Sequence, residues 1–218
     1  MHPNQAFRGI SGGASECRNL AFARDRGFGT LMLNADAGPL ASHIPFLLDQ
    51  TGATLDLHLV RSNPILGLLD PPQPALIAVA GADGYISPDW YDLPDQVPTW
   101  NYVAVHLRGT LQRLPDDALP EMLARQSAAY EAQLAPKPPW TMDKMTPETV
   151  TRMMRMIVPC RMTLASVEGT WKLGQNKPDA ARHAAADAVL RDGIGQNTAA
   201  LSRLMHATDD PDSIESAT

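Results

Sequence analysis

The residues with the clearest chemical character lie between Tyr85 and Tyr102, where aromatic side chains alternate with prolines and aspartates. This stretch reads YISPDWYDLPDQVPTWNY and holds five of the eight Trp and Tyr residues. Its prolines remove amide donors, so it cannot form one continuous helix. Rigid aromatic side chains on a proline-stiffened connection suit a planar ligand or a partner surface. The alternative is a loop that folds over the core with its aromatic side chains buried, and both readings stay open.

A second group of residues combines hydroxyl, imidazole and guanidinium groups. Ser42 and His43 lie in one predicted strand, and Arg61, Ser62 and Asn63 follow the end of the next. Arginine, serine and backbone amides are the usual donors to a phosphate group. The alternative is a surface arginine beside an Asn-Pro turn, which the sequence alone favours.

A third candidate is the polar turn WKLGQNK at residues 171–177, which contains Lys172, Gln175 and Asn176. Side-chain amides and lysine can bind the heteroatom edge of a base-like ring. The alternative is simply a polar end to a hairpin.

Three histidines fall in predicted strands: His43, His58 and His106. They show no HxH or HExxH spacing, so we predict partly buried neutral imidazoles and no metal site. The chain shows no G-x-S-x-G motif and no paired catalytic carboxylates, and the sequence therefore assigns no catalytic residue.

The elements that must position these residues are mainly strands, recognised by alternation or by short apolar runs. In residues 55–61, for example, Leu55, Leu57 and Leu59 face one way, and Asp56, His58 and Val60 face the other. Six strands at hairpin spacing predict a closed antiparallel β-barrel with peripheral helices, an α+β fold dominated by β structure. The predicted strands span residues 28–34, 40–48, 55–61, 75–80, 103–111 and 161–168.

Helices are expected at the periphery of this sheet. We predict a short helix capped by Ser15 and ended by Gly27, and a last helix capped by Asn197. The methionines in the helix before Pro159 are interpreted as soft core filling. The other predicted helices cover residues 117–134, a segment starting at Thr146-Pro147, and residues 180–190. We expect one domain over residues 1–206 and a disordered acidic tail over 207–218.

Composition limits the possible functions. The chain has 218 residues and a net charge of −6, which argues against strong non-specific binding to nucleic acid. Any direct DNA contact would need a local basic patch, formed by Arg152 and Arg155 with Lys137 and Lys144, and a solvated helix face is the simpler reading. We see no secretory signal and no apolar run that could span a bilayer, and we expect a cytoplasmic protein.

Several blocks together resemble the FMN-binding negative transcriptional regulator family, called PaiB-like. They are ASHIPF at 41–46, LVRSNP at 59–64, YISPDWY at 85–91, VPTWNY at 97–102 and EGTWKLGQNK at 168–177. The resemblance covers roughly residues 5–193, and the pairing of YISPxWY with VPTWNY is its most specific feature. The chain departs from the family pattern at Leu57, Val60 and Gly174, and the helix after Gly193 looks like an addition.

The resemblance implies an FMN-binding split barrel, related in fold to pyridoxamine-phosphate oxidases and flavin reductases, that forms a homodimer with FMN at the subunit interface. The residues implied to bind the FMN phosphate are Ser42, His43, Arg61 and Ser62, with Asn63 beside them. Those implied to flank the isoalloxazine are Tyr85, Ser87, Trp100, Asn101 and Tyr102. Lys172, Gln175 and Asn176 would approach from the other side or from the partner subunit.

Three function classes follow from these observations. The first is a PaiB-like regulator that acts through flavin binding and not through strong direct DNA contact. The second is an FMN-dependent oxidoreductase that acts on a small molecule. The third is a dimeric binding protein for another planar ligand, such as haem.

Overall fold

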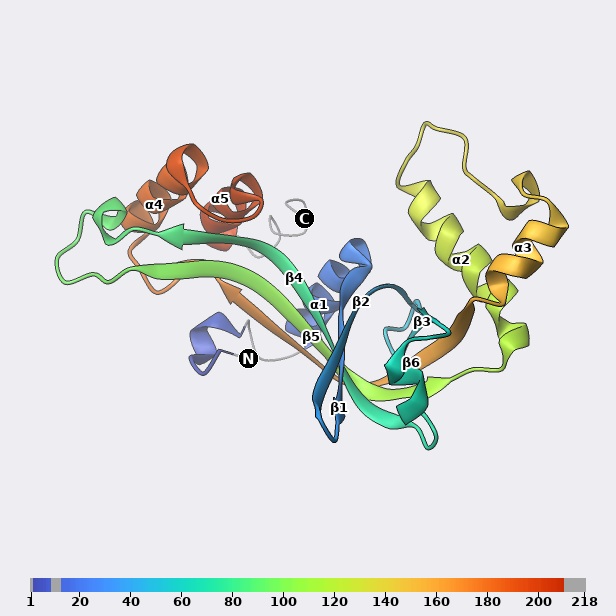
Figure 1. Ribbon diagram of the computed structural model, residues 1–218. Helices are drawn as coiled ribbons and strands as arrows, with labels where there is room; N and C mark the ends of the chain where they lie inside the picture. Colours follow the sequence, from blue (N-terminus) through green and yellow to red (C-terminus); the bar gives the residue numbers. More distant parts are fainter. Residues whose placement is uncertain (1, 9–12, 210–218) are drawn as a thin grey trace. The chain divides into compact units, whose positions relative to one another are not determined.

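The computed structural model describes residues 2–8 and 13–209 and contains a six-stranded antiparallel sheet with helices around it (Figure 1). The strands are β1 (Phe28–Ala35), β2 (Gly38–Leu48), β3 (Thr54–Val60), β4 (Gln73–Ile86), β5 (Thr99–Arg113) and β6 (Ile157–Lys172). The helices of eight or more residues are α1 (Gly13–Arg26), α2 (Leu119–Ala132), α3 (Pro147–Met154), α4 (Asp179–Asp192) and α5 (Thr198–His206).

The strand order is β1-β2-β3-β6-β5-β4, and it closes on itself because β4 also pairs with β1. β1 and β2 form the predicted hairpin, with Phe28 opposite Pro45 and Ala35 opposite Gly38. All six predicted strands are present, but β4, β5 and β6 extend well beyond their predicted bounds.

The predicted strand ended at Ala80, whereas β4 continues through Gly81 to Ile86, and the surroundings of Gly81 explain why. Glycine disfavours strands in general, which is why the pattern ended at Ala80. In the structure a Cβ on Gly81 would lie 2.8 Å from Phe22 Cζ and 2.9 Å from Val103 Cβ. The glycine therefore allows β4 to continue where a helix side chain and the neighbouring strand approach its backbone closely.

The chain divides into two compact units. Unit 1 comprises Met1–Asp25, Val79–His106 and Val167–Thr218, and unit 2 comprises Arg26–Ala78 and Leu107–Ser166. The long strands β4, β5 and β6 each contribute residues to both units.

The core of unit 2 contains alternate residues of its strands, among them Leu31, Phe46 and Leu57, each no more than 1% exposed. Helix α2 contacts β2. The Tyr130 hydroxyl lies 2.6 Å from the carbonyl oxygen of Gly27 and 2.8 Å from that of Phe46, within donating distance of either. This hydroxyl fixes the C-terminal part of α2 to the first hairpin.

Helix α3 begins at Pro147 as predicted, but the interpretation of its methionines as core filling is wrong. No residue of α3 is buried, and Met153 is 52% exposed. The helix is amphipathic, with Val150, Met153 and Met154 at helical spacing, yet its apolar side lines an open groove and not a closed core.

In unit 1, α4 and α5 pack against each other and Trp171 is almost fully buried. The Trp171 indole donates to Asn19 Oδ1 at 2.9 Å. Asn197 caps α5 as predicted, because its side chain accepts from the Ala200 amide. The prediction that Ser15 caps the first helix is wrong, since α1 already begins at Gly13.

Most of the predicted acidic tail, residues 210–218, lies outside the described residues, while Ala207–Asp209 form a short 3-10 helix. Within residues 2–8 and 13–209, no helix has the length and apolar character needed to cross a membrane.

Candidate functional site

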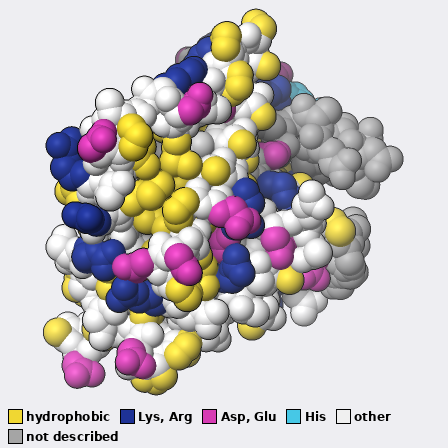
Figure 2. Space-filling model, turned by 90° about the vertical axis from the view of Figure 1, so that its right-hand side faces the viewer, with side chains coloured by type: hydrophobic (Ala, Val, Ile, Leu, Met, Phe, Trp, Pro, Cys, Tyr) yellow, Lys and Arg dark blue, Asp and Glu magenta, His cyan; other side chains and the backbone are white. Residues whose placement is uncertain are grey.

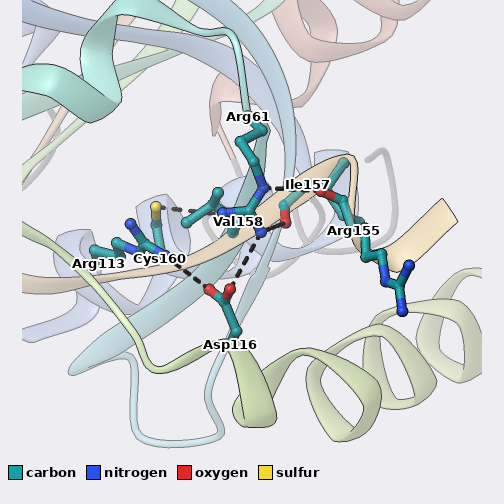
Figure 3. A network of polar contacts seen from close by, with 7 residues as sticks. All are labelled: Arg61, Arg113, Asp116, Arg155, Ile157, Val158 and Cys160. Carbon is teal, nitrogen blue, oxygen red and sulfur yellow. Dashed lines mark hydrogen bonds and ion pairs between the residues drawn. The ribbon is translucent and has the colours of Figure 1, made fainter. Parts of the chain in front are cut away.

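The Arg61 side chain, just after β3, lies at the centre of a polar network in unit 2 (Figure 3). Its Nε donates to the carbonyl oxygen of Arg155 at 2.8 Å, and Nη2 donates to that of Ile157 at 3.2 Å. Nη2 also lies 3.2 Å from Asp116 Oδ2. Arg113 Nη2 donates to the other carboxylate oxygen of Asp116 at 2.9 Å. The hydrogen bond from Arg113 is the main reason that the pKa of Asp116 lies below its usual value, and Arg61 adds to the effect.

Arg61 thus has a structural task whether or not it binds a ligand, because it ties the segment after α3 to the end of β3. Its side chain is 43% exposed. A guanidinium has five N–H donors, and the contacts recorded among the described residues use only Nε and Nη2. The Nη1 donors leave room for an additional anionic partner such as a phosphate group.

Two of the other predicted phosphate ligands are brought together. Asn63 Nδ2 donates to Ser42 Oγ at 3.1 Å, and Asn63 Oδ1 accepts from the Ile65 amide at 3.0 Å. His43 is exposed and stacks on Phe28, with ring centroids 6.5 Å apart. Ser62 is also exposed. All five predicted phosphate-group residues therefore lie in unit 2.

The aromatic stretch lies entirely in unit 1. Some of its side chains are buried, as in a loop that closes a core, and others are exposed, as a surface for a planar ligand would be. Tyr91 is 3% exposed with Lys177 Nζ over its ring at 5.1 Å, as expected for a loop that closes a core. Trp100 is 46% exposed and meets Tyr85 edge to face, with centroids 6.2 Å apart. Trp100 is therefore the most exposed aromatic side chain of this stretch and is available to a planar ligand.

Strand alternation separates the three residues of the WNY block. Trp100 is exposed and Tyr102 half-buried, whereas Asn101 is 1% exposed. The Asn101 amide donates to the Met205 sulfur at 3.5 Å, so its side chain meets α5. Ser87 precedes the 3-10 helix Pro88–Tyr91 and makes no capping bond with its side chain.

Lys172, at the end of β6, hydrogen-bonds through Nζ to the Thr99 hydroxyl. Burial lowers its pKa from the usual lysine value. Thr99 immediately precedes Trp100 in β5, so strand alternation directs the Thr99 hydroxyl, with its Lys172 partner, and the exposed Trp100 indole to opposite faces of the strand. Thr99 did not stand out in the sequence, since its partner is 73 positions away.

Gly174 and Gln175 shape the turn that follows β6. Gly174 has φ +81°, a conformation that L side chains rarely adopt, so the departure from the family's usual serine fits this turn. Gln175 Oε1 accepts from the Leu173 amide at 2.8 Å, and Nε2 donates to the Trp171 carbonyl at 2.6 Å. The Gln175 amide is thus used within the turn, while Asn176 is exposed.

The described residues contain no group of three or more His, Cys, Asp or Glu that could hold a metal ion. His43 and His58 lie in unit 2, and His106 is the last residue of the central segment of unit 1. Burial is the main reason that the pKa of His58 is lowered, which favours the neutral ring.

The fold is shared with solved structures of low sequence identity. The FAD and haem binding protein from Mycobacterium smegmatis is 19% identical, with a TM-score of 0.52 over 85% of this chain and 80% of that one. The conserved hypothetical protein Rv2991 from Mycobacterium tuberculosis is 16% identical, with a TM-score of 0.54 over 81% and 94%. These similarities place the chain in one fold class with those proteins.

Residues 1–166 match the family described as "Putative FMN-binding domain". The chain belongs to this FMN-binding family, and FMN is its cofactor. It is also 28% identical over 158 residues to the Protease synthase and sporulation protein PAI 2 of Bacillus subtilis, which covers 72% of this chain and 75% of the relative. These two matches confirm the resemblance drawn from the sequence blocks. A shorter match, 38% identical over 89 residues, is to the uncharacterized protein YKL070W of Saccharomyces cerevisiae.

The residues of each unit fit part of FMN chemically. Unit 2 offers the guanidinium of Arg61 with the Ser42 and Ser62 hydroxyls, a donor set suited to a phosphate. Unit 1 offers the exposed indole of Trp100 and the Lys172 amine, which suit a flat ring with polar edges. When bound, FMN supplies electron transfer at its ring. The family match ends at residue 166, so Lys172 and the turn after it lie outside the matched segment.

Proposed function

We propose that this protein is a flavin-responsive regulator of the PaiB-like type, whose output depends on FMN binding and not on strong direct contact with DNA. The family match over residues 1–166 carries this proposal. The name of the PAI 2 relative, which refers to protease synthase and to sporulation, is used in support of a regulatory role. As part of the proposal, the sheet is a split barrel of the FMN-binding type, and the protein is a cytoplasmic homodimer.

The proposed phosphate ligands are Arg61, Ser42, His43 and Ser62, with Asn63 holding Ser42. The arrangement of Asn63 and Ser42, 3.1 Å apart, supports a fixed hydroxyl in this group. The Arg61 guanidinium supplies positive charge, and its Nη1 supplies further N–H donors.

On the ring side, the proposed ligands are Trp100, Tyr85 and Tyr102 with Lys172. The half-buried Lys172 amine, held by the Thr99 hydroxyl, supports a contact with the electron-rich edge of the flavin. The remaining proposed ring-side residues are Ser87, Asn101, Gln175 and Asn176, of which Asn101 and Gln175 would act by shaping their surroundings.

The charge of the chain supports regulation without direct DNA contact. Its net charge of −6 produces a field that repels phosphates. Arg152 and Arg155 lie on α3 or at its end, beside an apolar groove, which is not the continuous basic surface that a duplex requires.

The decisive experiment compares FMN with riboflavin, which lacks the phosphate. FMN should bind more tightly, and Arg61→Ala should weaken FMN binding by about 1.5–3 kcal/mol while changing riboflavin binding little. Arg113→Ala is the matched control, because Arg113 also binds Asp116 but is not a proposed ligand. Equal affinities for the two flavins would refute the phosphate clamp.

The same preparation separates the other function classes. Bleaching of the flavin absorbance by a nicotinamide donor would favour the oxidoreductase. Protein that binds neither flavin but takes up haem would favour a binding protein for another planar ligand. Light scattering should show a dimer, and a particle near the chain mass of 23.6 kDa at micromolar concentration would contradict that part of the proposal.

A further inference from the structure

Unit 2 contains a groove of about 410 Å³ lined by residues of α2, α3 and the segment between them, by the end of β3 and by the start of β6. Five of its lining residues are methionines: Met142, Met145, Met153, Met154 and Met156. A neighbouring cavity of about 380 Å³ shares Ser127, Trp140 and Met142 with it. The two cavities together form an extended apolar depression, which we call the methionine groove.

The methionine groove is open to solvent. Val60 is 55% exposed, Met153 52% and Met156 64%, and Trp140 is also exposed. Figure 2 views the side on which Figure 1 labels α2 and α3, and it shows hydrophobic side chains gathered together, with Lys and Arg as well as Asp and Glu around them. Exposed apolar surface of this kind marks interaction sites, and flexible methionines are common where a surface adapts to a partner.

The charges near the groove indicate what kind of partner fits. Residues 137–156 contain four Lys or Arg and two Asp or Glu, and one of these bases, Lys137, pairs with Glu131 of α2, which also lines the groove. Arg152 and Arg155 are exposed, and in the sequence they flank Met153 and Met154, which line the groove. Lys144 donates to the Pro139 carbonyl and so stays on the same segment. A partner with an apolar face and an acidic flank would complement both features.

One wall of the groove is held in place. The Met156 carbonyl accepts from the Arg61 amide at 2.7 Å, and the Arg155 carbonyl accepts from Arg61 Nε at 2.8 Å. The end of α3 is therefore anchored to β3 while its methionine side chains stay free to adapt.

We propose that the methionine groove docks an amphipathic helix of another protein, with the apolar face of that helix in the groove and its acidic flank against Arg152 and Arg155. Helix-in-groove binding uses apolar side chains at i, i+3, i+4 and i+7, which suits an elongated apolar depression. The proposal goes beyond the flavin function. Every residue involved belongs to unit 2, and the one residue shared with the flavin proposal is Arg61, a proposed phosphate ligand that also holds the end of α3.

The test uses a fluorescently labelled helical peptide of about 18 residues, long enough to populate a helix, with leucines on one face and glutamates on its flanks. A second peptide replaces each glutamate by lysine, and a third scrambles the leucine positions. Fluorescence anisotropy with the full chain should show binding of the acidic peptide at least about tenfold tighter than of the other two.

Substitutions in the groove should then change binding in a specific way. Met153→Glu should weaken binding of the acidic peptide at least about tenfold. Leu190→Glu is the matched control, because Leu190 is a 55% exposed apolar residue on α4 of unit 1, and it should leave binding unchanged. Reversing both arginines, Arg152→Glu with Arg155→Glu, should transfer the preference to the lysine peptide. Circular dichroism confirms that each variant is folded.

Several results would overturn the proposal. Equal binding of the acidic and lysine peptides would remove the charge complementarity, and full binding by Met153→Glu would place the peptide elsewhere. If Met153→Glu instead changed the oligomeric state in light scattering, the groove would be the contact with a second copy of this chain. Peptide binding is measured on the flavin-free protein, so loss of the flavin proposal would leave this result intact.

Discussion

Removing the Arg61 side chain separates the structural task of this residue from its proposed role in FMN binding. Arg61→Ala deletes hydrogen bonds to the carbonyl oxygens of Arg155 and Ile157 and the ion pair with Asp116. Arg113→Ala deletes only the other ion pair of Asp116. The Arg61 side chain is 43% exposed and the Arg113 side chain 49%, so the two substitutions are compared at similar solvent exposure.

Arg61→Ala should lower the free energy of unfolding more than Arg113→Ala, because only Arg61 bonds to backbone carbonyl oxygens. An exposed ion pair contributes about 0–1 kcal/mol. Hydrogen bonds from a charged donor contribute about 1.5–3 kcal/mol when buried, and exposure should reduce the pair at Arg61 to about 1–2 kcal/mol in total. We therefore expect Arg61→Ala to lower the free energy of unfolding by about 1–3 kcal/mol, and Arg113→Ala by at most about 1 kcal/mol.

The assay is urea unfolding of the flavin-free protein, followed by circular dichroism, with the slope m compared among variants. Arg61→Lys keeps the charge but loses the planar fork, and it should fall between the wild type and Arg61→Ala. If Arg61→Ala and Arg113→Ala shifted the midpoint equally, the carbonyl contacts would contribute nothing and the reasoning would be refuted.

Three further predictions concern other charged groups. Asp56 is 7% exposed and accepts from Arg161 Nε at 2.7 Å, so Asp56→Asn should destabilise by about 1.5–3 kcal/mol in the same assay, and an unchanged midpoint would contradict this. Burial lowers the pKa of His58 below 6.5, so the unfolded chain binds its proton more readily and stability should fall as pH drops below about 6.5. His58→Gln should flatten that part of a stability-versus-pH curve. The isolated protein should show no sequence-specific DNA affinity tighter than about micromolar at physiological salt, and an anisotropy preference for one duplex that is lost on replacing Arg152 and Arg155 would show otherwise.

The strands were predictable because their signal is local. Alternation such as that of Leu55, Leu57 and Leu59 requires only that one side of a sheet be buried, and these residues are indeed no more than 1% exposed. The strand ends were less predictable, because Gly81 reads as a strand breaker until the close approach of Phe22 is known.

The environments of the candidate residues could not be predicted, because they depend on distant parts of the chain. The sequence around Arg61 predicts a ligand residue. Its ion pair with Asp116 could not be predicted, because the two residues are 55 positions apart. Met153 has the helical spacing of a core residue, and only the tertiary structure shows that its side of the helix is left open. Asn101 and Trp100 were grouped by the family motif, while strand alternation gives them opposite environments.

The way the chain passes between the two units has a consequence for how this protein can change by recombination. Neither unit is a continuous piece of sequence, since β4, β5 and β6 each begin in one and end in the other. A single crossover between related genes cannot exchange one unit as a module, and no truncation point releases either unit intact. An exchange of either unit between related genes would therefore need several crossovers, one at each strand that passes from one unit to the other.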